Sequence, residues 1–112
     1  PHSEYLTIYK DGRYCPLHFR KISCLQAEGG ATRVFSETGE YLIYRPLREF
    51  EEVLPKEYFF PAHRSYLVNL CFIQHIDLWI NGALQLELRG VGEKVPVSRA
   101  KTRELKRRMN MQ

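Results

Sequence analysis

The 112-residue chain lacks the sequence marks of the common enzyme and membrane-protein classes. It has no apolar run near the roughly 18 residues that a membrane-spanning helix needs, and it has no basic segment followed by an apolar one, as a secretory leader requires. The motifs HExxH and GxSxG and the phosphate-binding glycine loop are absent. Ser98 and Lys101 spell SxxK, but the partner motifs of that catalytic site are missing. We therefore expect neither an enzyme nor a membrane protein.

Cysteine is also scarce. Cys15, Cys24 and Cys71 are odd in number, and no two of them have CxxC spacing. This pattern argues against a disulfide framework and against a zinc site. We expect three small buried hydrophobic residues in a cytoplasmic protein that has no metal or other cofactor.

What the chain does have is enough apolar mass for one domain, and an uneven charge. Hydrophobic residues make up 44% of the sequence, which favours a folded chain over a disordered one. Residues 1–88 hold nine Lys/Arg and eleven Asp/Glu, whereas residues 89–112 hold eight and two. A basic end of this kind suits a polyanionic partner, although it equally suits a solvated C-terminal helix whose dipole it complements.

Turn signals divide the chain into short strands. Hairpin turns are predicted at Asp11-Gly12, Gly29-Gly30, Gly39 and Asn81-Gly82. The expected strands cover residues 5–9, 14–19, 24–28, 32–36, 40–44, 73–80, 83–89 and 94–97.

Two segments have helical rather than strand periodicity. Apolar residues between Pro46 and Pro55 recur at helical spacing, and glutamates occupy the other face, which makes this helix a poor candidate to touch a polyanion. A second helix is predicted from Arg99 to Met109, with Ser98 as its cap. The residues thus predict a mainly antiparallel β domain with two short helices.

The segment FFPAHRSYLVNL, residues 59–70, combines apolar and polar residues in an unusual way. Its apolar residues can clamp the segment to the core and fix the direction of His63, Arg64 and Ser65. A fixed Arg64 fork could read guanine in the major groove, while His63 or Ser65 could bind a phosphate. The structural alternative is an internal network in which Arg64 pairs with a helix glutamate.

The segment KVPVSR, residues 94–99, offers a comparable arrangement. It runs from a predicted strand into a predicted helix, and Ser98 lies at the junction. The N-terminus of a helix presents backbone N–H groups that can hold a phosphate. Arg99 would then project from the first turn, or it would be an ordinary solvated arginine.

These two blocks resemble the LytTR-type DNA-binding domains of bacterial response regulators. The family pattern reads F-x-R-x-H-R-S-[YF]-[ILV]-V-N, then I-x-x-I, then V-P-[VL]-S-R. Phe59 and residues 63–69 match the first block, residues 95–99 match the last, and residues 22–28 are similar to the family strand I-x-x-I-E-A. Ala62 and Pro61 depart from the usual residues before the histidine, and Gly29-Gly30-Ala31 lacks the Asn-Tyr common in the family's first loop.

The resemblance implies an elongated stack of small antiparallel sheets whose loops enter successive major grooves of DNA. It implies base reading by Arg64, Arg99 and a first loop, residues 29–33, that contributes Thr32 or Arg33. The phosphate contacts expected from the resemblance and from the charge pattern are His63, Ser65, Asn69, Lys94, Ser98, Lys101, Arg103 and Arg107.

The same resemblance implies an effector domain within a longer regulator. Since the chain begins at Pro1, we expect a single domain, about residues 5–109, that follows an N-terminal sensor or receiver domain, with residues 1–4 as linker or foreign residues. Two copies would bind imperfect direct repeats of double-stranded DNA. The alternative is a β-rich protein-interaction or ligand-binding module without nucleic-acid specificity. An RNA-binding module is a weaker alternative, because it would need stacking aromatics on an open sheet face, whereas most aromatics of this chain lie within apolar patterns.

Overall fold

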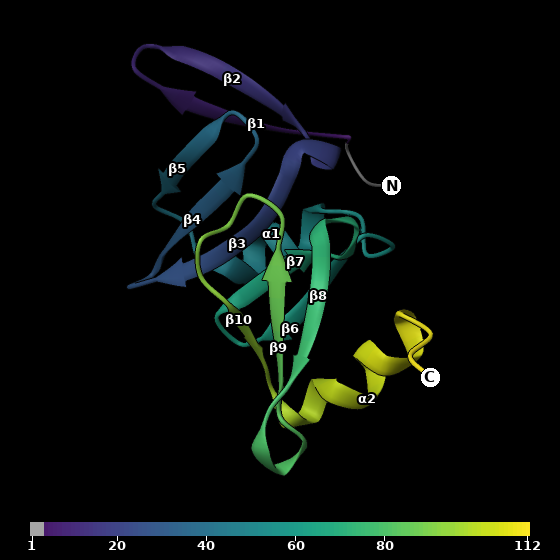
Figure 1. The fold of residues 1–112 in the computed structure, drawn as a ribbon. Coiled ribbons are helices and arrows are strands. Elements are labelled where there is room, and N and C mark those ends of the chain that lie inside the picture. The colour runs from purple at the N-terminus through teal and green to yellow at the C-terminus, as the bar shows by residue number, and fades with distance from the viewer. Residues whose placement is uncertain (1–3) are drawn as a thin grey trace.

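The protein is an elongated β structure. A computed structural model describes residues 4–112, with principal extents of 47 × 28 × 22 Å (Figure 1). Within these residues, three antiparallel sheets and two α-helices are stacked along the long axis. The mainly β fold with two short helices, and its elongated stack of small sheets, are confirmed.

The N-terminal end of the stack is a two-stranded hairpin. Strand β1 (Tyr5–Lys10) pairs with β2 (Arg13–His18) around Asp11-Gly12. Both turn residues have positive φ, 53° and 79°, as a tight two-residue hairpin turn requires. The predicted hairpin is therefore confirmed.

The middle of the molecule is a five-stranded sheet with the order β5-β4-β3-β7-β6. The pairs β3–β4, β4–β5 and β6–β7 are hairpins, and β3 also pairs with β7, some forty residues later in the chain. Its strands are β3 (Ile22–Glu28), β4 (Ala31–Ser36), β5 (Gly39–Ile43), β6 (Phe59–His63) and β7 (Tyr66–Asn69).

The third sheet has the order β10-β9-β8. In its central strand, Leu84, Leu86 and Leu88 are buried, and the residues between them are only partly buried, as the alternation in the sequence predicts. Its strands are β8 (Ile73–Leu78), β9 (Leu84–Leu88) and β10 (Val95–Val97).

The two helices cover opposite sides of the middle sheet. Helix α1 (Leu47–Val53) contacts β3 and β7, and helix α2 (Arg99–Arg108) contacts β6 through the fully buried Leu105. Single 3-10 turns cover Phe19–Lys21 (η1), Leu70–Phe72 (η2) and Ile80–Gly82 (η3).

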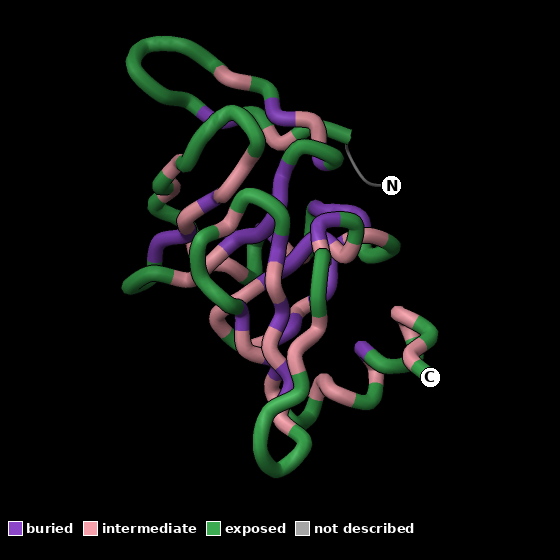
Figure 2. Tube along the Cα trace, viewed as in Figure 1, coloured by how far each residue is buried: buried purple, intermediate pink, exposed green. Residues whose placement is uncertain are grey.

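The core consists of two clusters, one on each face of the five-stranded sheet. The first joins that sheet to the N-terminal hairpin and α1, and the second joins it to the three-stranded sheet and α2. Adjacent residues of one strand therefore pack into different clusters. Phe59 and Leu67 lie in the first cluster, and Phe60 and Val68 lie in the second. Burial on both faces explains the apolar density of residues 59–70 (Figure 2).

The prediction for the cysteines is only partly correct. Cys24 is buried between the two sheets, but Cys15 is half-buried and Cys71 is exposed. The apolar neighbours of Cys71 are misleading because it belongs to the 3-10 turn after β7, where successive residues face different directions.

Candidate nucleic-acid interface

The turn between β6 and β7 presents the three polar residues of the first block. Phe60 and Val68 anchor its two strands in the core, so the turn is held from both sides. Arg64 lies at its apex and is exposed. Among residues 4–112, no hydrogen bond or ion pair engages the Arg64 guanidinium. The alternative of a pairing with a helix glutamate is therefore absent from the structure.

His63 is oriented by the same turn. Its Nδ1 accepts a hydrogen bond from the backbone N–H of Ser65 at 3.1 Å. A neutral imidazole that accepts at Nδ1 carries its proton on Nε2. His63 can therefore donate a hydrogen bond from Nε2 to an anion without acquiring a positive charge.

The start of α2 lies beside this turn. The backbone N–H of Ser98 donates to the carbonyl of Ala62 at 2.8 Å, which fixes the helix start against β6. Ser98 occupies the N-cap position, as predicted, but its side chain makes no capping hydrogen bond. Of the N–H groups in the first turn, that of Lys101 donates to the carbonyl of Ser98 at 2.9 Å. Those of Arg99 and Ala100 have no side-chain partner from the cap and can face an anion. Arg99 follows and is exposed, without a side-chain partner in the described part of the chain.

A hollow of about 430 Å³ joins these elements. His63, Arg64, Ser98 and Lys101 line it together, although they come from two separate parts of the sequence. Burial raises the pKa of the neighbouring Tyr66 hydroxyl, which keeps this phenol neutral.

Helix α1 also borders the hollow, through Leu47, Arg48 and Glu51. The sequence interpretation missed Arg48, because the helix was regarded as an acidic surface far from any polyanion. No local pattern marks this arginine, because only the packing of α1 on β3 and β7 brings it to the site. Arg48, Arg64 and Lys101 thus give the lining of the hollow three cationic side chains, and Glu51 gives it one carboxylate.

The first predicted loop is shorter than expected. Strand β4 begins at Ala31, so the connection to β3 is the two-residue turn Gly29-Gly30. Thr32 is fully buried, and its hydroxyl donates to the carbonyl of Arg45 at 2.7 Å. The structure therefore does not support base reading by Thr32, because its only side-chain donor points inward.

Arg33 is committed to carboxylates. Its Nε and Nη2 donate to the two carboxylate oxygens of Glu28 at 2.7 and 3.0 Å, and Nη1 lies 3.7 Å from Glu40. This fork lowers the pKa of the Glu28 carboxyl and raises that of Arg33, in both cases chiefly through the hydrogen bonds between them. Base reading by Arg33 would require this pair to open.

Asn69 has a structural role instead of the predicted phosphate contact. Its side chain is 1% exposed. Nδ2 donates to the carbonyls of Phe19 and Ile22 at 3.3 and 3.0 Å, and Oδ1 accepts from the N–H of Cys71 at 3.0 Å. The structure does not support a phosphate contact by Asn69, because these bonds tie β7 to the start of β3 and hold the side chain in the interior.

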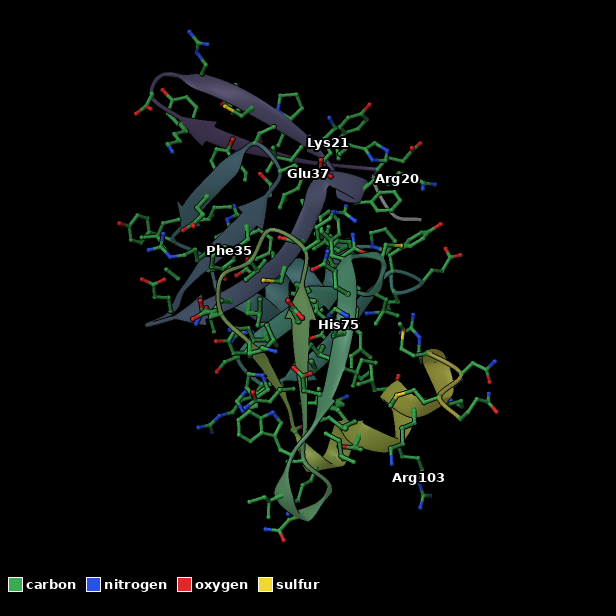
Figure 3. The ribbon with its side chains drawn as sticks, in the orientation of Figure 1. Arg20, Lys21, Phe35, Glu37, His75 and Arg103 are labelled. Atoms are coloured by element: carbon green, nitrogen blue, oxygen red, sulfur yellow. The ribbon has the colours of Figure 1, made fainter. Side chains whose placement is uncertain are left out.

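The predicted cations Lys94, Arg103 and Arg107 do not line the hollow. Arg103 and Arg107 are exposed on α2, and Arg103 projects away from the body of the molecule (Figure 3). Lys94 forms an ion pair with Asp77 across the three-stranded sheet, and this hydrogen bond raises the pKa of Lys94. Arg108, in contrast, donates to the carbonyls of Lys56 and Glu57 and serves the fold.

In residues 4–112, no group of three or more His, Cys, Asp or Glu side chains is arranged to hold a metal ion. Within the same range, no helix is both long and apolar enough to cross a membrane.

Comparison with known proteins gives consistent matches. The profile of the family described as LytTr DNA-binding domain matches residues 12–110. The transcriptional regulatory protein YpdB of Escherichia coli K12 is 32% identical over 106 residues, which is 95% of this chain and 43% of that protein. The sensory transduction protein LytT of Enterococcus faecalis is 32% identical over 111 residues, which is 99% of this chain and 46% of that protein.

The fold also has a solved counterpart. A LytTr DNA-binding domain from Bacillus cereus superposes with a TM-score of 0.84 and 28% identity, covering 97% of this chain and 99% of that one. The chain spans less than half the length of the curated relatives named above.

Proposed function

The chain belongs to the LytTr DNA-binding domain family, and on this premise we propose that it binds double-stranded DNA sequence-specifically as the effector domain of a transcriptional regulator. The family is one of DNA-binding domains and not of enzymes. The observation that carries the proposal is the presence of two exposed guanidinium groups without side-chain partners, Arg64 and Arg99, on adjacent anchored segments.

The backbone supports base reading by these two arginines. The hydrogen bond from Ser98 to Ala62 holds the start of α2 beside β6, and the β6–β7 turn is in turn held by the hydrogen bond from Ala27 N–H to Ser65. An arginine fork recognises guanine O6 and N7 in the major groove only if its direction is set. Arg64 and Arg99 would enter the major groove from such anchored positions.

Phosphate contacts would surround the two reading groups. His63 through Nε2, the first N–H groups of α2 after Ser98, and Lys101 lie at the hollow. Ser65, Arg103 and Arg107 would add phosphate contacts outside the hollow, and Lys94 would do so after leaving Asp77. Such contacts position the protein on DNA and make its affinity depend on salt.

The rest of the regulator would determine when and where this domain acts. Since the relatives are more than twice as long as the matched region, we propose that residues 5–109 form one domain of a longer cytoplasmic protein with an N-terminal sensor or receiver domain. Two copies would occupy imperfect direct repeats.

Selection of bound duplexes from a random pool tests the proposal. The expected result is an enriched motif that contains guanine at the positions read by Arg64 and Arg99. The selected duplex should outcompete a scrambled duplex of the same composition at moderate salt. Equal binding of both duplexes would refute sequence specificity, and binding of neither would favour a protein-interaction module.

A further inference from the structure

The tip of the β8–β9 hairpin is an exposed apolar surface. Leu78, Trp79 and Ile80 are consecutive in the chain and are 75%, 56% and 82% exposed. Figure 2 shows this tip exposed at the end of the molecule opposite the N-terminal hairpin. Three large apolar side chains together in water are unfavourable for folding alone, and such patches commonly mark a binding surface.

The turn itself does not require these residues. Asn81 and Gly82 supply the positive φ angles of 66° and 75° that reverse the chain, and the N–H of Trp79 donates to the carbonyl of Ala83 at 2.8 Å. Polar residues would fit the positions before Asn81 equally well. The apolar side chains are thus presented by an ordered hairpin, and the fold does not account for them.

The strand register places this tip next to the proposed reading site. Val97 in β10 pairs with Leu84 in β9, and Leu84 pairs with Leu78 in β8. Strands β8 and β10 are both antiparallel to β9, so they run in the same direction. Directly after these paired residues, β10 continues into Ser98 and Arg99, and β8 continues into Trp79. Figure 1 shows the tip beside the start of α2.

The separation suits the dimensions of a duplex. Two strand spacings place β8 about 10 Å from β10, and the major groove is about 12 Å wide. With Arg99 in the major groove, the tip would reach the sugar–phosphate wall of that groove and the minor groove beyond it. Apolar side chains at such positions pack on deoxyribose or wedge between base steps.

The local charge permits this approach. Residues 78–83 contain no acidic side chain. The nearest carboxylate in sequence before the tip, Asp77, is paired with Lys94. A polyanion therefore meets a neutral tip beside the cationic Arg99.

We propose that the tip formed by Leu78, Trp79 and Ile80 is a further DNA-contacting element, which inserts into the minor groove next to the major groove entered by Arg99. This inference rests on the proposed function and extends it. The tip would contribute affinity and DNA bending, and it would favour flexible pyrimidine–purine steps at one edge of the site.

The chain offers a direct probe, because Trp79 is its single tryptophan. Its fluorescence should be quenched or shifted when the selected duplex is added, and its access to acrylamide, a neutral quencher, should fall in the complex. Binding confirmed by mobility shift with unchanged Trp79 fluorescence and unchanged quencher access would overturn this inference and leave the proposed function intact. Absence of binding to any duplex would overturn both.

Variants provide a second test. Trp79→Ala should weaken binding about tenfold, close to 1.4 kcal/mol, and hydroxyl-radical footprinting should show lost protection at one edge of the site only. Tyr14→Ala, which removes a 73% exposed aromatic from the N-terminal hairpin, is the matched control and should change neither. An unchanged footprint with Trp79→Ala would refute the minor-groove contact. If the protein self-associates without DNA and this association shields Trp79, the minor-groove contact is also refuted. The tip would then be a contact between two copies of the chain.

Discussion

Replacement of Asn69 by alanine should destabilise the fold rather than remove a DNA contact. The side chain makes three hydrogen bonds, to the carbonyls of Phe19 and Ile22 and from the N–H of Cys71. These bonds connect the end of β7 to residues that lie 47 and 50 positions earlier in the chain. The variant therefore loses a tie between distant segments in the middle sheet.

The size of the loss in stability depends on whether each hydrogen-bond partner of Asn69 finds another partner in the variant. The carbonyl of Phe19 keeps its bond from the N–H of Ile22, and Cys71 is exposed, so water can reach its N–H. The carbonyl of Ile22 belongs to a fully buried residue and loses a buried donor. Only the Ile22 carbonyl is therefore left without a replacement for its lost donor, and at about 1–3 kcal/mol for one buried unsatisfied group the free energy of unfolding should fall by about 2 kcal/mol. For a domain of this size, the midpoint of thermal unfolding should then fall by roughly 7–14 °C.

Urea unfolding followed by circular dichroism measures this change, and DNA affinity is compared well below the unfolding midpoint of the variant. We expect a lower midpoint with an unchanged slope, and unchanged affinity for the selected duplex. A loss of less than 1 kcal/mol together with weaker DNA binding would refute the reasoning and restore Asn69 as a phosphate contact.

Three further predictions concern single side chains. Arg64→Ala should reduce discrimination between the selected and scrambled duplexes by about 1–3 kcal/mol in a competition mobility shift, whereas Arg13→Ala, which removes an exposed arginine from the N-terminal hairpin, should preserve it. Lys101→Ala should weaken all duplexes alike and reduce the slope of log affinity against log salt by about 0.9, and an unchanged slope would contradict a phosphate contact. Burial raises the pKa of the Cys24 thiol to about 12, so mass spectrometry after alkylation at mildly alkaline pH should find Cys71 modified and Cys24 unmodified.

Local patterns were sufficient to predict most elements of the fold. The glycine-containing turns are local signals, because positive φ depends on the turn residues themselves. The alternation of Leu84, Leu86 and Leu88 predicts the buried face of β9, since strand residues two apart share a face. The pairing of β3 with β7 has no such local signal, because it depends on segments about forty residues apart.

The roles of individual polar residues were harder to predict for the same reason. Thr32 and Asn69 belong to residue types that bind phosphate when exposed, but the carbonyls to which their side chains donate lie 13 or more residues away. Arg48 reaches the hollow only because α1 packs on the middle sheet. Sequence motifs thus located the candidate surface, whereas tertiary contacts decided which of its side chains face solvent.

Arg33 and Arg64, each near the end of a hairpin, show how tertiary contacts determine which arginine is free to bind DNA. Arg33 lies opposite Gln26 in the β3–β4 register, and Glu28 is two residues further along the same face, within reach of a long side chain. Release of Arg33 to DNA would leave the Glu28 carboxylate unpaired and facing phosphates, which opposes binding. The β6–β7 hairpin carries no acidic residue, so Arg64 has no such competitor in its own turn. We therefore expect base discrimination to come from the two guanidinium groups of Arg64 and Arg99, with the Gly29-Gly30 end adding little.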